Sequence, residues 1–102
     1  MLIHNVYFWL KEGVTEGQRS EFEKGMQDLA AAVPEVAQSA IGRPASTPGR
    51  EVVDNSFGHS LFLWFNSVED HNTYQDHAEH HSFVDKFKGL WEKVLVRDSN
   101  LA

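Results

Sequence analysis

The chain has 102 residues, 41% of them apolar and 24% charged, and it contains no cysteine. This predicts one folded domain over residues 1–102 and excludes disulfides, thiolate catalysis and cysteine-ligated metal centres. Fifteen acidic against nine basic residues give a net charge of -6, without the basic cluster that nucleic-acid binding requires. Apolar runs such as Val6–Leu10 are far shorter than the ~20 residues that span a bilayer, and no basic stretch precedes Val6–Leu10 as in a signal peptide. We therefore expect a soluble, cytoplasmic protein that binds neither nucleic acid nor membranes.

The first two predicted elements are a strand and a helix. Residues 2–10 are rich in β-branched and aromatic side chains and end at Lys11-Glu12-Gly13, which favours a strand. Thr15 and Gln18 have the spacing of a capping box, in which each side chain satisfies a free backbone N–H at the start of a helix. The helix should end before Pro34, which has no N–H to donate. Its apolar stripe consists of Phe22, Met26, Leu29 and Val33.

The middle of the chain contains two predicted strands separated by a long loop. Val36–Ile41 is a short strand candidate, and residues 57–65 form a strong one with apolar side chains on both faces. Residues 42–55 between them contain two prolines and two glycines and predict a loop with solvated arginines at positions 43 and 50. Val52-Val53 would either extend a strand or pack the loop down. A loop of this length is typical of functional lids or poorly ordered segments.

The last third of the chain predicts helical segments and a final strand. Ser67 caps a helix with Asp70 three residues later, and the segment to about His77 is polar. A second amphipathic stretch follows, so the region forms either one kinked helix or two. Val94–Val96 is the last predicted strand, with a tail from Asp98 onward. The apolar positions of the second stretch are Phe83, Val84, Phe87, Leu90 and Trp91.

The order β-α-β-β-α-β predicts an α+β, ferredoxin-like fold: a four-stranded antiparallel sheet with its helices on one face. If the helices cover the side of His4 and His59, the open face is largely aromatic. Its residues are Ile3, Tyr7, Trp9, Phe62 and Trp64. Each of these side chains loses roughly 1.5–3 kcal/mol of burial free energy if it stays in water. The sum over the five is comparable to the ~5–15 kcal/mol free energy of unfolding of a whole domain. We therefore expect a second copy to cover this face, giving a sheet-to-sheet homodimer, a dimeric α/β barrel. A one-residue register error would exchange two apolar faces and leave the argument unchanged.

Histidines are the main candidates for chemistry. Four of the six lie between positions 71 and 81 beside Tyr74, and they are His71, His77, His80 and His81. Histidine can act as a general base, and a tyrosine can donate a hydrogen bond to a developing oxyanion. A helix break near Ala78 could bring Tyr74 and His80 over one pocket. The structural alternative is that His71, His77 and His81 are solvated.

The two remaining histidines lie on predicted strands. His4 and His59 can approach each other beneath the helices if their strands are neighbours. The alternative for each is a neutral core histidine with a hydrogen-bond partner, because a buried polar group must be satisfied.

The histidine tract does not predict a metal site. His77 has partners at i+3 and i+4 that could chelate an ion with it, but HAEHH is not the HExxH pattern because Glu79 falls at the third position. The only candidate third ligands are Asp76, His4 and His59. We therefore expect no metal and no cofactor.

Several segments together resemble one protein family. They are His4, the segment FNSVED at 65–70, the segment YQDHAEH at 74–80 and the segment WEKVLVRD at 91–98. Over nearly the whole chain they resemble the stress-responsive A/B barrel family, a group of small dimeric ferredoxin-like proteins. The tyrosine followed by His-x-x-His is the most specific part. The family usually has a proline between the two histidines, where this chain has Ala78-Glu79.

The resemblance implies a set of site residues and a kind of ligand. A polyketide cyclase of this architecture uses no cofactor, and its catalytic tyrosine and histidine match Tyr74 and His80. Its supporting histidines match His4 and His59. The ligand would be a small aromatic or polyketide-like molecule. Further ligand-binding residues implied are Phe22, Met26, His77, Phe83, Trp91, Val94, Val96 and Asp98, of which Phe22, Met26, Phe83 and Trp91 are equally expected as plain core.

Three functions remain open at this point. The first is a cofactor-free enzyme in which His80 removes a proton next to a carbonyl and Tyr74 binds the resulting enolate, in a pocket between helices and sheet. The second is a non-enzymatic dimeric module for ligand binding or stress tolerance, with Tyr74 and His80 as structural groups. The third is a cofactor-free oxygenase of the related dimeric barrel type.

Overall fold

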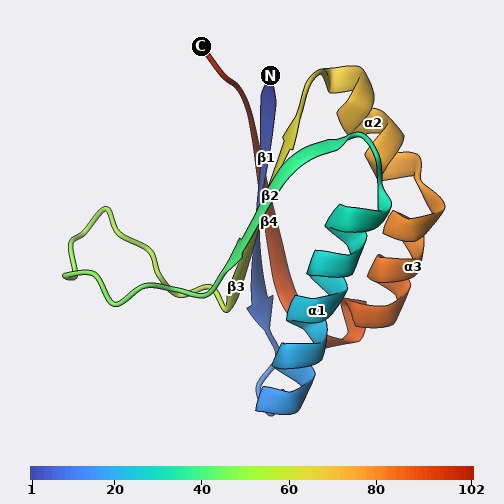
Figure 1. Cartoon of the computed structure of the whole chain (residues 1–102). Helices are drawn as coiled ribbons and strands as arrows, with labels where there is room; N and C mark the ends of the chain where they lie inside the picture. The colour runs from blue at the N-terminus through green and yellow to red at the C-terminus, as the bar shows by residue number, and fades with distance from the viewer.

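The computed structural model describes residues 1–102 and contains one four-stranded sheet covered by helices. The elements in chain order are β1 (Leu2–Leu10), α1 (Glu16–Ala32), β2 (Val36–Gly42), β3 (His59–Phe65), α2 (Val68–Asp76), α3 (Ala78–Phe87), the 3-10 turn η1 (Lys88–Leu90) and β4 (Trp91–Asn100). The strands pair antiparallel in the order β2-β3-β1-β4. The helices all lie on one side of the sheet (Figure 1). This confirms the predicted ferredoxin-like arrangement.

Helix α1 begins and ends where the sequence predicts. The Gln18 N–H donates to Thr15 Oγ1 at 3.1 Å, and the Thr15 N–H donates to Gln18 Oε1 at 2.8 Å, which completes the capping box. The helix ends at Val33, whose extended backbone suits a residue that precedes a proline.

The central strand β1 separates a buried face from an open one. Its even-numbered residues from Leu2 to Phe8 are buried beneath the helices, whereas its odd-numbered residues from Ile3 to Trp9 are half-buried on the open face. Strand β3 repeats this alternation, with His59 on the helix side and Trp64 on the open side. The predicted assignment of the two faces is therefore confirmed. The apolar core consists of Leu2, Val6, Phe8, Phe22, Met26, Leu29, Val33, Leu61, Leu63, Phe65, Tyr74, Phe83 and Phe87.

The pairing register corrects one prediction about the strand histidines. Strand β3 runs antiparallel to β1, so His4 lies opposite Leu63 whereas His59 lies opposite Phe8. Four residues of strand, about 14 Å, separate positions 4 and 8. The expectation that His4 and His59 approach each other is therefore wrong.

Two strand boundaries also differ from the sequence prediction. Strand β4 starts at Trp91 and continues to Asn100, which lies opposite Leu2, so Asp98 is a strand residue and not the start of a tail. Strand β3 begins at His59 rather than at residue 57.

The helical region after β3 is divided into two helices. Residue His77 has an extended backbone (φ -69°, ψ 141°) and ends α2. Its Nδ1 atom accepts a hydrogen bond from the Glu79 N–H at 3.1 Å, so the same residue caps the start of α3. The break therefore forms without a proline at this position.

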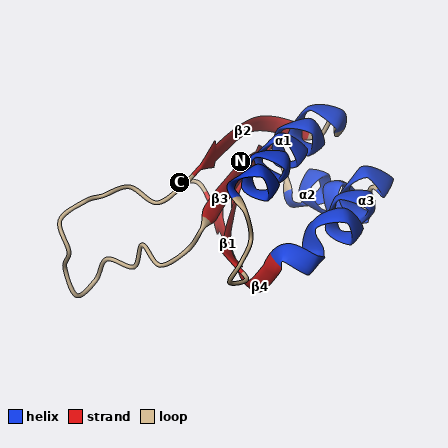
Figure 2. Cartoon of the chain, turned by 90° about the horizontal axis from the view of Figure 1, so that it is seen from below, coloured by secondary structure: helices blue, strands red, loops and turns tan.

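The segment between β2 and β3 projects away from the helices, beyond the open side of the sheet (Figures 1 and 2). Asn55 Nδ2 ties its two arms together by donating to the Ala45 carbonyl at 2.9 Å and to Thr47 Oγ1 at 3.1 Å. Val52 at its tip is 80% exposed and belongs to no strand. Val52 therefore neither extends a strand nor packs the loop down, and both expectations for this residue are wrong.

The helices of the fold are amphipathic and short, and none has both the length and the apolar composition to cross a bilayer.

The close contact between α1 and α3 at Gly25 predicts that a larger residue there would destabilise the fold. A Cβ atom there would lie 2.3 Å from the buried Phe87 ring, so we expect Gly25→Ala to destabilise the fold by about 1–3 kcal/mol. Gly17→Ala, in the first turn of the same helix, meets nothing closer than Thr15 Oγ1 at 3.9 Å. This control should be neutral or stabilising by up to about 1 kcal/mol. Urea unfolding of both variants checks the pair, and equal effects would contradict the packing described.

Candidate functional site

A cavity of about 150 Å³ lies between the sheet and the helices α2 and α3. Most of its wall is apolar, and three polar rings, those of His4, Tyr74 and His80, meet at it. A mainly apolar cavity with a few convergent polar groups is the usual form of a small-molecule site. The full lining is His4, Val6, Phe8, Leu61, Tyr74, Gln75, His80, Phe83, Val84, Trp91, Val94 and Val96.

The helix break at His77 brings Tyr74 and His80 together. Tyr74 lies in the last turn of α2 and is 2% exposed, and His80 lies in the first turn of α3. Their rings meet edge to face with centroids 4.8 Å apart. The buried His80 Nδ1 atom has no hydrogen-bond partner in the protein. The sequence expectation that a break near Ala78 places both rings over one pocket agrees with this geometry.

Burial sets the protonation states of this pair. It raises the pKa of the Tyr74 phenol well above its usual value of 10, and no charged group or hydrogen bond opposes the shift. Burial also lowers the pKa of His80 below 6.5, and the neighbouring His81 and His4 add to this effect. At neutral pH the site therefore holds a protonated phenol beside a neutral imidazole, that is, a hydrogen-bond donor beside a proton acceptor.

The buried His4 forms a hydrogen-bonded pair with the partly exposed Asp98 near the end of β4. The register of β1 and β4 places the two residues opposite each other, and His4 Nδ1 lies 2.5 Å from Asp98 Oδ1. Burial lowers the pKa of His4, although the hydrogen bond and charge of Asp98 act in the opposite direction. The neutral imidazole therefore donates through Nδ1 to the carboxylate, which leaves Nε2 as an acceptor.

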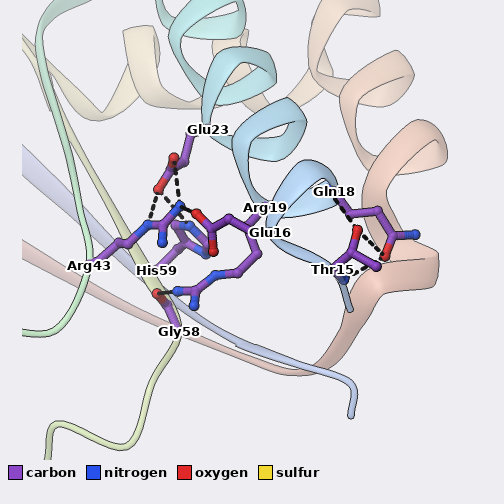
Figure 3. A network of polar contacts seen from close by, with 8 residues as sticks. All are labelled: Thr15, Glu16, Gln18, Arg19, Glu23, Arg43, Gly58 and His59. Atoms are coloured by element: carbon purple, nitrogen blue, oxygen red, sulfur yellow. Dashed lines mark hydrogen bonds and ion pairs between the residues drawn. The ribbon is translucent and has the colours of Figure 1, made fainter. Parts of the chain in front are cut away.

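His59 lies outside the cavity, in a separate ionic network. Its ring is fully buried, with Nε2 at 2.8 Å from Glu23 Oε2. Arg43 Nε donates to the same oxygen at 2.5 Å, and Arg43 Nη2 donates to Glu16 Oε1 at 2.6 Å (Figure 3). These contacts lower the pKa of Glu23 to about 2, with the Arg43 hydrogen bond as the largest cause. Arg43 is exposed, as expected from the sequence, but its ion pairs with Glu23 and Glu16 were not expected, and they tie the start of the loop to α1.

The other sequence-predicted ligand-binding residues divide into wall, backing and rim. Phe83 and Trp91 form wall, whereas the fully buried Phe22 and Met26 do not line the cavity. Phe22 packs behind the wall, 5.9 Å from both the Phe83 and the Trp91 ring centroids. Val94 and Val96 lie on the edge strand β4 at the rim of the cavity and are 41% and 46% exposed. His77 does not line the cavity and instead caps α3.

Sequence reasoning missed His71, which it placed in solvent. The ring is half-buried, 4.9 Å from the His4 ring and 5.6 Å from the Phe65 ring. Its position three residues before the buried Tyr74, on the same helix face, is the signal that could have found it. His81, by contrast, is exposed as expected. The tract 77–81 forms no group of three metal-ligating side chains; the one such group contains His4, His71 and Asp98.

The family model described as "Stress responsive A/B Barrel Domain" matches residues 2–101. The chain belongs to the stress-responsive A/B barrel family. This confirms the resemblance found in the sequence.

Three relatives show the range of this family and fold. Olivetolic acid cyclase from Cannabis sativa is 28% identical over 95 residues, which cover 93% of this chain and 91% of the relative. Hydroxynitrile lyase from Passiflora edulis superposes with a TM-score of 0.85 at 21% identity, covering 99% and 93% of the two chains. A dimeric ferredoxin-like protein of unknown function from Thermobifida fusca superposes with a TM-score of 0.81 at 18% identity, covering 98% and 90%. The two structural likenesses establish the fold.

The buried histidines predict that stability falls in mild acid. The pKa values of His4, His59 and His80 are all below their usual 6.5 in the fold. As the pH falls through about 6.5, the unfolded chain therefore binds more protons than the folded chain does. The free energy of unfolding decreases in this pH range as a result. We expect the urea midpoint to be lower at about pH 5.5 than at about pH 7.5. His80→Gln should weaken this pH dependence and exposed His81→Ala should not. A midpoint that rises toward pH 5.5 would contradict the burial described.

Proposed function

We propose that this protein is a cofactor-free enzyme that carries out proton transfer on a small aromatic or polyketide-like substrate. His80 is the general base and Tyr74 is the hydrogen-bond donor. One observation carries the proposal: a neutral imidazole and a protonated phenol lie edge to face, 4.8 Å apart, at the wall of an apolar cavity. This pairing supplies both groups that enolate chemistry needs.

The chemistry follows from the two protonation states. His80 takes a proton from the carbon next to a carbonyl, and the electron pair of that C–H bond forms an enolate whose oxygen accepts a hydrogen bond from Tyr74. The enolate carbon then attacks a second carbonyl of the same molecule and forms a new carbon–carbon bond. The alkoxide left by this attack takes a proton back from protonated His80, so the step is balanced without a cofactor. Aldol-type cyclisation, isomerisation and related proton transfers share this first step.

The remaining predicted residues have supporting roles in this proposal. His4, oriented by Asp98, presents a polar group to the cavity 6.0 Å from the Tyr74 ring and binds the polar end of the substrate. His59 acts indirectly, because its ring packs on Phe22 at 5.3 Å and so supports the cavity wall from behind.

The size of the cavity limits the substrate. A dry cavity of about 150 Å³ accommodates one benzene ring, and the volume here is about 150 Å³. The reacting part of the substrate is therefore about one ring in size. A longer tail would extend over the exposed apolar rim at Val94 and Val96. The cyclase relative, which is 28% identical over most of both chains, supports ring-forming chemistry.

A non-enzymatic ligand-binding module is the second candidate. The small cavity favours it, because a space that one ring fills leaves little room for the folded chain that must bend on itself before a ring closes. In that case Tyr74 and His80 are structural groups, and their removal changes stability without changing any turnover.

We also propose that two copies pair through their open sheet faces. Tyr7, Trp9, Phe62 and Trp64 remain only half-buried on this face of the single chain. Covering such an aromatic surface is favourable, and an identical sheet is the simplest complement. The dimeric description of the Thermobifida fusca neighbour supports the same arrangement.

The active-site proposal predicts a response of Trp91 fluorescence to ligand, because this ring lines the cavity. We expect saturable quenching or enhancement when 2,4-dihydroxybenzoate, a one-ring acid, is added to the wild type. His80→Ala and Tyr74→Phe should bind it at least about tenfold more weakly, since a lost hydrogen bond to a charged ligand costs ~1.5–3 kcal/mol.

The matched control is His81→Ala, which removes an exposed neighbouring histidine. It should bind like the wild type. Turnover of a short β-polyketo thioester, followed by chromatography, then distinguishes the two candidates. Cyclised product from the wild type but not from His80→Ala supports an enzyme; binding without product favours the module, and no binding by the folded wild type would refute both.

The dimer proposal predicts a change in mass when charge is placed on the open face. We expect wild-type protein to sediment at twice the chain mass of 11.6 kDa. Trp64→Glu should give monomers, because a buried unpaired carboxylate opposes association. Val68→Glu, at a site 51% exposed in the first turn of α2 on the helix-covered side, should remain dimeric. A monomeric wild type would refute the arrangement.

A further inference from the structure

Three side chains from different elements converge beside the cavity. His4 on β1, His71 on α2 and Asp98 on β4 each offer one donor atom, and these atoms all lie within 4.8 Å of one another. Residues far apart in the sequence thus meet at one point through the pairing of β1 with β4 and the packing of α2 on the sheet. The ring contact between His4 and His71 and the 2.5 Å hydrogen bond between His4 and Asp98 define the group.

His71 carries an unused lone pair at this point. Its Nδ1 atom lies 3.0 Å from Asn72 Oδ1. An amide oxygen only accepts hydrogen bonds, so Nδ1 carries the proton and Nε2 carries the free pair of electrons. Nε2 is buried and has no partner in the protein. A buried acceptor without a partner indicates a missing donor or cation.

The rings are held in place before any ligand arrives. His71 stands perpendicular to Phe65 with centroids 5.6 Å apart, and His4 contacts the edges of Phe65 and Tyr74 at 6.3 and 6.0 Å. Ligating histidines in metal sites generally donate their second ring N–H to an oxygen acceptor. The side-chain oxygen of Asn72 plays this part for His71.

The charge of the group suits a divalent transition metal. As metal ligands, two imidazoles and one carboxylate carry a net charge of about -1, and no lysine or arginine is among the groups that act on the pKa of His4. Two histidines and one carboxylate are a donor set found in zinc and iron(II) sites that leave positions open for another ligand. Magnesium and calcium prefer sets made of oxygen atoms.

We propose that His4, His71 and Asp98 form a binding site for a divalent transition-metal ion of the zinc class. The ion takes the place of the proton between His4 Nδ1 and Asp98 Oδ1, and that proton moves to His4 Nε2, so the imidazole stays neutral. The proposal does not rest on the enzymatic function proposed above, although His4 belongs to both sites. An ion held here would lie at the cavity wall and engage the histidine that otherwise faces the substrate.

Calorimetric titration of the full chain with zinc chloride tests the site. We expect about one zinc ion per chain for the wild type and no heat from magnesium chloride. His71→Ala and the nearly isosteric Asp98→Asn should each bind zinc at least about tenfold more weakly. The Asp98 side chain is 40% exposed. Asp98→Asn should therefore retain the fold even if the half-buried position of His71 does not tolerate alanine.

The matched control removes the competing histidine pair on α3. The double variant His77→Ala/His81→Ala should bind zinc like the wild type, because neither residue belongs to the group. A rise in unfolding temperature with zinc, present in the wild type and this control but absent in Asp98→Asn, provides a second readout. Loss of binding in the double variant, or undiminished binding in folded Asp98→Asn and His71→Ala, would overturn the proposal.

Discussion

The register of the central strand β1 is the constraint on which the rest of the structure depends. It is hydrogen-bonded on both sides, so one alignment with β3 and one with β4 decide which side chains face the helices. A slip of one residue would turn His4 to the open face and separate it from Asp98. The hydrophobic pattern alone does not specify this register strongly, because both faces are apolar. The His4–Asp98 pair specifies it, since the hydrogen bond between these side chains forms only when positions 4 and 98 lie opposite each other.

Most of the fold could be predicted from local chemistry, and the errors have a common physical origin. The capping box at Thr15 and the stop at Pro34 depend on neighbours in the sequence, and both are found as expected. The end of β4 depends instead on a partner ninety residues away. Asp98, Ser99 and Asn100 are typical turn formers, but pairing with β1 holds them in a strand. Arg43 similarly looks like a loop residue until α1 brings Glu23 and Glu16 within reach.

The candidate site shows the same division between local and long-range information. A helix break predicted near Ala78 sufficed to place Tyr74 and His80 together, because both residues lie within two turns of the break. The positions of His59 and His71 required knowledge of the tertiary structure. Antiparallel pairing moves His59 to the far end of the sheet from His4, whereas the packing of α2 moves His71 toward it. Histidine is poorly assigned by sequence because its polarity fits solvent, core and ligand sites equally well.

The projecting loop between β2 and β3 divides the chain into two halves whose strands alternate in space. In the order β2-β3-β1-β4, the first half contributes β2 and β1 and the second half contributes β3 and β4, so no strand has a neighbour from its own half. A cut at the exposed loop tip would therefore leave two fragments without any sheet of their own. Each fragment is a template for the other, and their joining restores every ladder of hydrogen bonds at once. If the chain were cut at this loop, the two fragments would therefore have to bind each other in order to fold.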